Sequence, residues 1–241
     1  MVKVFRFLKV KTFHFFAFIY AKKLPLQANR YLVIAPHPDD EIFGCCGLLH
    51  RLIKMGKDVH IVIVTQGEAV HKKPLIPVSE IVAKRRELAT SAGKIIGLTS
   101  EQYTFLDWGD SKIHEKQIYG NRPKELTSII ESFKPEIIFT THPFEGGDHY
   151  HTTQIVSQTV RICSISIKIM YYCVWIWYRS LRLDWKNSYT LLMDKNEREI
   201  KSKAIDNYAL PSDKFGMPYS GYLNKLPQFC RWRKELFFEV L

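Results

Sequence analysis

Short apolar runs alternate with amphipathic stretches along the first two thirds of the chain. The runs that predict strands lie at 31–35, 58–67, 102–108 and 135–143. The stretches with helical spacing lie at 44–57, 79–97 and 122–134, and Ser79 is placed to cap the second of them. Strands that alternate with helices in this way predict βαβ units. We therefore expect a single-domain, Rossmann-like α/β fold with a mostly parallel sheet and helices on both faces.

Between the first predicted strand and the first predicted helix stands a cluster of charges. The stretch "YLVIAPHPDDEIFGCCGLL", residues 31–49, places one histidine and three acids between two apolar runs. A carboxylate buried without a partner is so costly that it normally takes up a proton. The pattern therefore indicates a positively charged partner, for which a metal ion is the obvious candidate.

A second polar cluster, "GGDHYH" at 146–151, follows the predicted strand at 135–143. Because parallel strands end at the same edge of a sheet, both clusters should meet there. His37 and Asp40 can point at one place, and a third ligand can come from His149 or His151. A catalytic zinc site typically has two or three nitrogen and oxygen ligands from the protein and one coordination position open to water. Another divalent metal would also fit. Zinc lowers the pKa of bound water to about 7.

The residues that carry this chemistry resemble a known family. "APHPDDE" resembles the "AHPDDE" signature of the PIG-L/LmbE-like de-N-acetylases, zinc hydrolases that act on N-acetylglucosamine-type sugars, and the second cluster resembles their "HPDH" element. The resemblance implies zinc ligands at His37, Asp40 and His151. It also implies that Asp39, expected to point elsewhere and remain free, is the general base. Glu41 resembles the family's supporting acid.

The resemblance extends to the groups that assist the leaving amine and bind the sugar. The first histidine of "HPDH" aligns with Asp148, so either Asp148 or the neighbouring His149 does its work. We expect His149, because a histidine can be a cation near neutral pH and stabilise an oxyanion. The substrate-contacting arginine of the family's second helix corresponds to Lys84 or Arg85. Asp110 resembles a sugar-contacting acid, or it caps its own turn.

The resemblance continues loosely through the rest of the chain. It includes a predicted strand at 171–179, in which Trp175, Trp177 and Tyr178 alternate, and a helix that contains residues 201–208. One of these aromatic rings can stack on a sugar, and the others would be packing residues.

The N-terminal residues 1–28 form a basic segment that we set apart from a deacetylase domain at 29–241. No stretch reaches the roughly 18 uncharged apolar residues that span a bilayer, so a transmembrane helix is excluded. Two interpretations remain. The segment is a basic amphipathic helix that lies on an anionic membrane, or it packs on the body of the protein.

Charge and cysteine content exclude other classes of protein. The net charge of +11 is scattered apart from the N-terminus, which argues against a nucleic-acid binder. Five cysteines without disulfide spacing indicate reduced core residues. We therefore expect a cytoplasmic protein, with contact to the inner membrane face as the open alternative.

Three functions compete for this sequence. The first is a metal-dependent hydrolase that removes the acetyl group from an N-acetylated sugar conjugate. The second is a catalytically weakened sugar-binding protein of the same fold. A nucleotide-binding Rossmann protein lacks its glycine fingerprint after the first strand. The sequence distinguishes neither the amino-sugar conjugate nor the oligomeric state.

Overall fold

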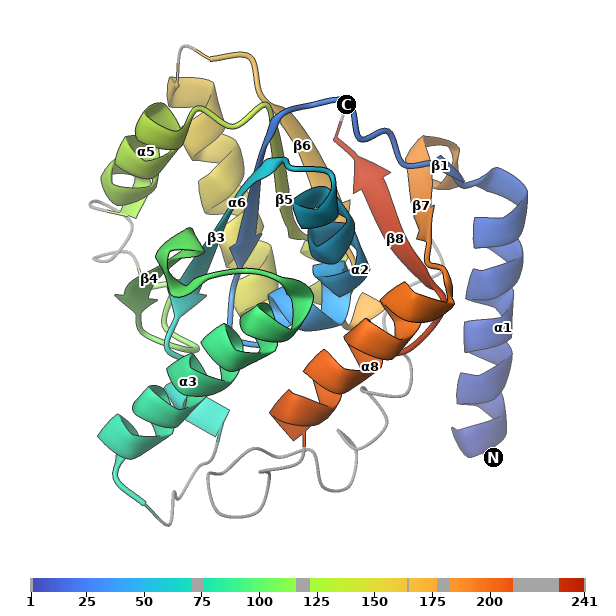
Figure 1. Cartoon of the computed structure of the whole chain (residues 1–241), viewed down its shortest axis with the longest axis horizontal. Coiled ribbons are helices and arrows are strands. Elements are labelled where there is room, and N and C mark those ends of the chain that lie inside the picture. Colours follow the sequence, from blue (N-terminus) through green and yellow to red (C-terminus); the bar gives the residue numbers. More distant parts are fainter. Residues whose placement is uncertain are drawn as a thin grey trace.

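The computed structural model describes residues 2–70, 76–115, 122–163, 165–176, 183–209 and 230–240. Within these ranges one sheet of eight strands has the order β1-β7-β8-β6-β5-β2-β3-β4 (Figure 1). The strands are β1 (Lys22–Lys23), β2 (Arg30–Ala35), β3 (Asp58–Thr65), β4 (Tyr103–Trp108), β5 (Ile137–Thr141), β6 (Lys168–Tyr172), β7 (Ser188–Leu192) and β8 (Lys234–Glu239). The helices are α1 (Val2–Tyr20), α2 (Asp40–Lys54), α3 (Val78–Ile96), α5 (Arg122–Phe133), α6 (Gly147–Ile162) and α8 (Lys195–Ala209). Short 3₁₀ turns are η1 (Glu68–Val70), η2 (Ser100–Gln102), η3 (Pro143–Glu145) and η4 (Trp185–Asn187).

The sheet is mostly parallel, as the alternation of strands and helices predicts. β2 pairs in parallel with β3 and β5, and β4 and β6 continue the sheet in parallel on either side. Only β8 runs against its neighbours, β6 and β7. The hydrophobic pattern did not predict β1, β7 or β8. The order of strands reverses between β2 and β5, so a ligand site is expected at their carboxyl ends.

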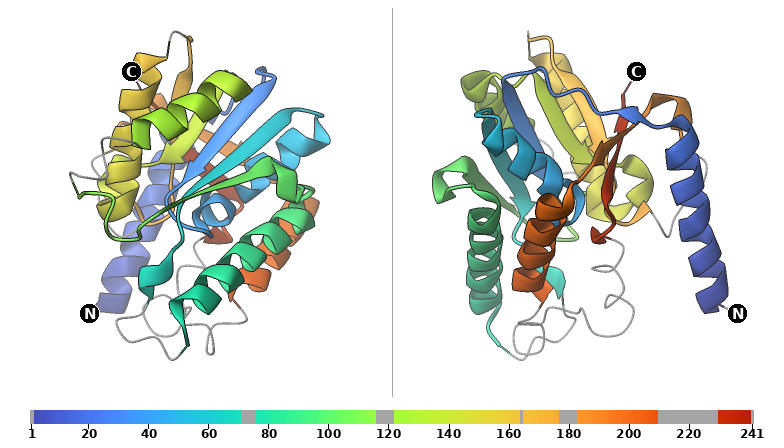
Figure 2. Two further views of the ribbon diagram at one scale, coloured as in Figure 1. Left: turned by 90° about the vertical axis from the view of Figure 1, so that its left-hand side faces the viewer. Right: turned by 45° about the vertical axis from the view of Figure 1, so that its right-hand side comes forward.

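Helices cover both faces of the sheet, which explains why the central strands are continuously apolar. Along β2, Tyr31, Val33 and Ala35 point into the core formed with α2, α3 and α8. The alternate residues Leu32 and Ile34 point into the core formed with α5 and α6. The two layers of helices lie on opposite sides of the sheet in Figure 2. The predicted fold class is therefore confirmed.

Two local expectations were wrong. Ser79 does not cap α3, because the helix begins at Val78 with Pro77 at the N-cap position and no side-chain cap bond. The expected strand at 171–179 ends at Tyr172. The next backbone N–H groups, from Val174 onward, donate to a buried carboxylate instead of to a strand. Trp177 and Tyr178 lie outside the described residues.

The N-terminal segment packs against the edge of the sheet. β1 extends the sheet by pairing in parallel with β7. In α1, Phe13 and Ala17 are buried in a third core with Trp185 and Phe238. None of the helices in the described ranges has the length and apolar character needed to cross a bilayer. The boundary at residue 28 stays a prediction.

A buried ion pair joins the central helix to the C-terminal elements. Lys201 of α8 and Glu235 of β8 are 2% and 3% exposed, and Lys201 Nζ lies 2.5 Å from Glu235 Oε1. The same carboxylate accepts hydrogen bonds from the backbone N–H groups of Gly47 and Leu48 in α2, at 2.7 and 2.8 Å. Glu235 therefore links three elements that are distant in sequence.

Removing either partner of this pair should destabilise the protein to a different extent. Lys201→Met leaves a carboxylate that still accepts two N–H groups, whereas Glu235→Leu leaves a buried ammonium without its partner and removes the carboxylate that Gly47 and Leu48 share. We expect Glu235→Leu to cost about 3–5 kcal/mol of unfolding free energy in urea denaturation, and Lys201→Met to cost less. Lys195→Met, which removes an exposed pair with Glu199, is the control and should change stability by less than about 0.5 kcal/mol. Equal losses at 201 and 235 would contradict this account of Glu235.

Candidate active site

The turn that follows β2 brings His37 and Asp40 together. Thr65, at the end of β3, fastens this turn through two hydrogen bonds of 2.9 Å, from its backbone N–H and its hydroxyl to the carbonyl of Pro36. α2 begins at Asp40, whose Oδ2 accepts the backbone N–H of His37 at 3.1 Å. The two side chains are therefore fixed by their own backbone before any ligand binds.

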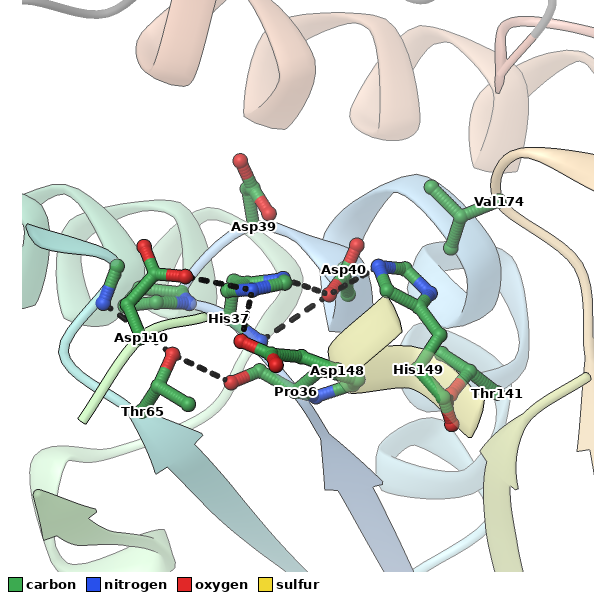
Figure 3. A network of polar contacts seen from close by, with 12 residues as sticks. Pro36, His37, Asp39, Asp40, Thr65, Asp110, Thr141, Asp148, His149 and Val174 are labelled. Atoms are coloured by element: carbon green, nitrogen blue, oxygen red, sulfur yellow. Dashed lines mark hydrogen bonds and ion pairs between the residues drawn. The ribbon is translucent and has the colours of Figure 1, made fainter. Parts of the chain in front are cut away.

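One carboxylate oxygen is the centre of the site. Asp40 Oδ2 lies 3.2 Å from His37 Nδ1 and 3.5 Å from His149 Nε2, and Figure 3 shows the two rings on either side of it. Ligand atoms of these three residues all lie within 4.8 Å of one another. His37 is partly exposed, and Asp40 and His149 are buried. Two imidazoles and one carboxylate form the kind of donor set that holds a catalytic divalent metal.

His149 reaches the site because α6 begins immediately before it. The left-handed backbone of Gly146 (φ 73°) and Gly147 (φ 56°) turns the chain into the helix, a conformation that glycine adopts at no steric cost. Thr141, at the end of β5, donates its hydroxyl to the carbonyl of His149 at 3.1 Å. Thr153 donates in turn to the carbonyl of Thr141 at 2.6 Å. The first turn of α6 is thus bonded to the end of the central strand.

Glu145 orients His149, and the sequence analysis missed it. Its Oε2 lies 2.7 Å from His149 Nδ1 and both side chains are buried, so Nδ1 carries the proton and Nε2 presents its lone pair toward Asp40. The other oxygen accepts the backbone N–H groups of Val174, Trp175 and Ile176, at 2.6, 2.8 and 3.1 Å. Glu145 lies in η3 and His149 in α6, so the turn between them forms the pair and no helical spacing in the sequence indicates it.

Carboxylates also hold the far side of His37. Its Nε2 lies 3.3 Å from Asp110 Oδ1 and 3.4 Å from Asp148 Oδ2 (Figure 3). Both acids are anchored by backbone donors, Asp110 by Ala69 at 2.9 Å and Asp148 by Ser111 at 2.6 Å. Nε2 therefore carries the proton of His37, which leaves Nδ1 to act as a ligand. Each histidine of the donor set is backed by acidic side chains.

The charges of the site perturb one another strongly. Burial lowers the pKa of His37, but its hydrogen bonds to Asp110, Asp148 and Asp40 outweigh burial and raise that pKa well above 6.5. Burial also opposes the charge of His149, and the neighbouring Asp40 and Glu145 raise its pKa. In the opposite sense, burial raises the pKa of Asp40, and the charges of His149 and His37 bring it below its usual value. The cluster thus favours added positive charge, which a divalent cation would supply.

Asp39 has an unusual backbone and a cationic partner. Its φ of 149° lies where residues other than glycine are strained, a feature that concentrates at functional sites. Its carboxylate lies on the other side of His37 from Asp148 (Figure 3), and Oδ2 is 3.1 Å from Arg85 Nη2. Asp39 is therefore not free, as the sequence suggested, but held in place by an ion pair.

Arg85 fixes the whole turn around Asp39. It is only 5% exposed, and its guanidinium donates to the carbonyls of Gly67 and Pro38, both at 2.9 Å. Glu41 supports the same turn, since its Oε2 accepts the backbone N–H of Asp39 at 3.1 Å. Burial, followed by the charge of Asp39, raises the pKa of Glu41 to about 8. These contacts agree with the supporting role expected of Glu41.

Several residues expected at the site are placed differently. His151 belongs to neither of the two groups of potential ligands found in the described residues, and its ring lies 5.8 Å from that of His114. Lys84 forms an ion pair with Glu87 of its own helix. Arg85 and Asp110 are buried among protein groups, so their contacts are those of positioning residues. The proposed substrate contacts of Lys84, Arg85 and Asp110 stay predictions.

The geometry agrees with the similarity of the chain to known proteins. The model of a family described as PIG-L, GlcNAc-PI de-N-acetylase, matches residues 32–160. The chain belongs to the PIG-L family. The match covers β2 to α6, and thus every residue of the candidate site.

Curated relatives of this PIG-L chain are deacetylases of amino sugars. Diacetylchitobiose deacetylase of Thermococcus kodakarensis is 28% identical over 130 residues, which cover 52% of this chain and 46% of the relative. The 1D-myo-inositol 2-acetamido-2-deoxy-alpha-D-glucopyranoside deacetylase of Mycobacteroides abscessus is 24% identical over 180 residues, which cover 62% of this chain and 61% of the relative. The chain thus spans about half to three fifths of the length of these relatives.

Solved structures share the PIG-L fold over nearly the whole chain. N,N'-diacetylchitobiose deacetylase from Pyrococcus horikoshii superposes with a TM-score of 0.68 at 21% identity, covering 89% of this chain and 84% of its own. The zinc-inhibited form of teicoplanin deacetylase Orf2 has the same TM-score at 16% identity, covering 88% of this chain and 98% of its own. At these identities the similarity establishes the fold.

The support that Glu145 gives to His149 predicts a metal phenotype. Glu145→Gln preserves the size of the side chain but removes its charge, so we expect a 10- to 100-fold loss of affinity for Zn²⁺, measured by competition with a chelator. Glu239→Gln is the matched control, because Glu239 pairs with Lys168 away from the site. Equal affinities of the Glu145 variant and the unchanged protein would rule out this role.

The choice between two histidines of α6 is tested by metal content. His149→Ala removes a residue of the donor set and should abolish stoichiometric binding of Zn²⁺, whereas His151→Ala should retain it. Elemental analysis after dialysis measures both. Loss of metal from the His151 variant alone would restore the ligand set implied by the family signature.

Proposed function

We propose that this chain is a metal-dependent hydrolase that removes the acetyl group from an N-acetylated amino sugar of the N-acetylglucosamine type. The observation that carries the proposal is the convergence of His37, His149 and Asp40 on one point, with Asp39 fixed beside them. Membership of a de-N-acetylase family and relatives named for amino-sugar deacetylation support it. The substrate would be a sugar conjugate.

A divalent metal fits the residues present. His37, Asp40 and His149 would hold it, and the carboxylates behind the two histidines leave one nitrogen of each available as a ligand. Such a metal supplies Lewis acidity, which lowers the pKa of water and polarises a carbonyl. Imidazole and carboxylate ligands favour zinc. Because one structural neighbour is described as a zinc-inhibited form, activity assays should compare Zn²⁺ with Co²⁺ and Mn²⁺.

Asp39 is proposed as the general base. It accepts a proton from the water whose oxygen attacks the acetyl carbon. The carbon–nitrogen bond then breaks to give acetate and the free amine of the sugar. The ion pair with Arg85 holds the carboxylate in place beside the three residues of the donor set.

The alignment of residues 146–149 with the family's "HPDH" element indicates which group returns the proton to the leaving amine. With His149 as a ligand, Asp148 and His149 match the last two residues of "HPDH", and Gly146 stands at the position of its first histidine. Asp148 and His149 are then engaged in holding the metal site and are not available as acids. We therefore assign the return of the proton to Asp39, which received it from water.

Position 146 holds glycine where the motif has its first histidine. This replacement favours the second candidate function, a sugar-binding protein with weakened catalysis. The two functions differ in one measurement. A hydrolase releases acetate from at least one member of a panel of N-acetylhexosamine conjugates, and a chelator stops the release. A binding protein takes up metal and binds a conjugate, as calorimetry would detect, without releasing acetate.

The role of Asp39 is tested by separating turnover from metal binding. Asp39→Asn keeps the size of the side chain but cannot take a proton, so kcat should fall by roughly a hundredfold or more while metal content is unchanged. Asp184→Asn, at the exposed N-cap of η4, is the matched control and should keep full activity. Undiminished acetate release from the Asp39 variant would require another base.

A further inference from the structure

The described half of α1 anchors the helix by one face. Phe13 is fully buried and Ala17 is 1% exposed. The ring of Phe13 packs edge-on against Trp185 at a centroid distance of 5.4 Å, and Phe16 stacks on the same ring at 5.3 Å. The direction in which the rest of the helix surface faces is therefore fixed by the body of the protein. In Figure 1, α1 lies beside β7 at the end of the sheet. It packs on the face of β8 to which Leu236 and Phe238 point, opposite to the face of Phe237.

The opposite face of α1 exposes large apolar side chains. Phe15, Phe18 and Ile19, here called the outer ridge, are 59%, 77% and 51% exposed. Their i, i+3, i+4 spacing places them on one side of the helix. Single exposed apolar residues are ordinary, but adjacent ones on an anchored helix mark a surface that binds something.

The charge around the outer ridge identifies the partner. Lys11 lies one turn before Phe15, and Lys22 and Lys23 follow the helix; all three are exposed. Lys234 of β8 holds its ammonium 5.7 Å from the centroid of the Phe18 ring. The sequence of α1 contains no acidic residue. Two copies of so basic a face would repel each other, whereas an anionic surface would attract it.

We propose that the outer ridge docks on the surface of a membrane that contains anionic phospholipids. The aromatic and aliphatic side chains enter the boundary between headgroups and acyl chains, while the lysines around them meet lipid phosphates. The helix lies on the bilayer and does not cross it, because its inner face is occupied by the protein. The proposal concerns a surface remote from His37 and does not depend on the proposed activity.

The test uses the full chain and sedimentation with vesicles of phosphatidylcholine, alone or mixed with phosphatidylglycerol. We expect binding to the mixed vesicles only, weakened by added salt. The triple variant Phe15→Ser, Phe18→Ser, Ile19→Ser should bind roughly a hundredfold more weakly, because three apolar side chains are lost. Lys22→Gln with Lys23→Gln should weaken binding by roughly thirtyfold. Ile162→Ser, at an equally exposed position at the end of α6, is the control and should bind as the unchanged protein does.

Three results would overturn the proposal. The unchanged protein would fail to bind mixed vesicles, or the triple variant would bind them equally well. The third is a dimer, seen in sedimentation equilibrium and lost in the triple variant, without any vesicle binding, which would identify a second copy as the partner. Phe18→Ser alone repeats the test with the smallest change, in case the triple variant loses its helical circular dichroism.

Discussion

Negative charge buried at the ends of β2 and β5 is the constraint on which this site depends. Asp40, Asp110, Glu145 and Asp148 are all buried. Carboxylates so far from water are stable only where donors or cations meet them. Most of the surrounding structure meets that requirement, since backbone N–H groups and the two histidines face these carboxylates.

The donors come from every element at this edge of the sheet. The loop after β4 supplies backbone N–H groups, the chain after β6 supplies three more, and α3 contributes a guanidinium. The same contacts fix the tautomers of two histidines and the strained backbone of Asp39. One network therefore both satisfies the buried charges and sets the geometry of the candidate site.

The sequence predicted those parts of the fold and the site that depend on a short local pattern or on the repeated alternation of strands and helices. β2 was predictable because both of its faces are covered, so that Tyr31 to Ala35 read as one apolar run. The meeting of the two polar clusters followed from the polarity of parallel strands. The "APHPDDE" motif located His37, Asp39 and Asp40 because all three lie within a single turn of chain.

The remainder depended on tertiary contacts that no local pattern encodes. Whether His149 or His151 reaches the site depends on the residue at which α6 begins, and two positions along a helix turn a side chain by more than half a revolution. The end of β6 depends on Glu145, almost thirty residues earlier in the chain. Asp110 and Arg85 were recognised as important, but their burial could not be foreseen. β1 has only two residues, and β8 runs antiparallel to both of its neighbours, so these strands belong to no βαβ repeat that the alternation could indicate.

The way in which Glu145 holds residues 174–176 has a consequence for which substitutions this segment tolerates. The carboxylate binds the main chain there and makes no demand on the side chains at these positions. Val174 and Ile176 are fully buried and accept only side chains that fit the core, whereas Trp175 is partly exposed and can vary while the anchor, and with it the orientation of His149, is retained. Proline would break the anchor at any of these positions, because it lacks the N–H group that Glu145 accepts.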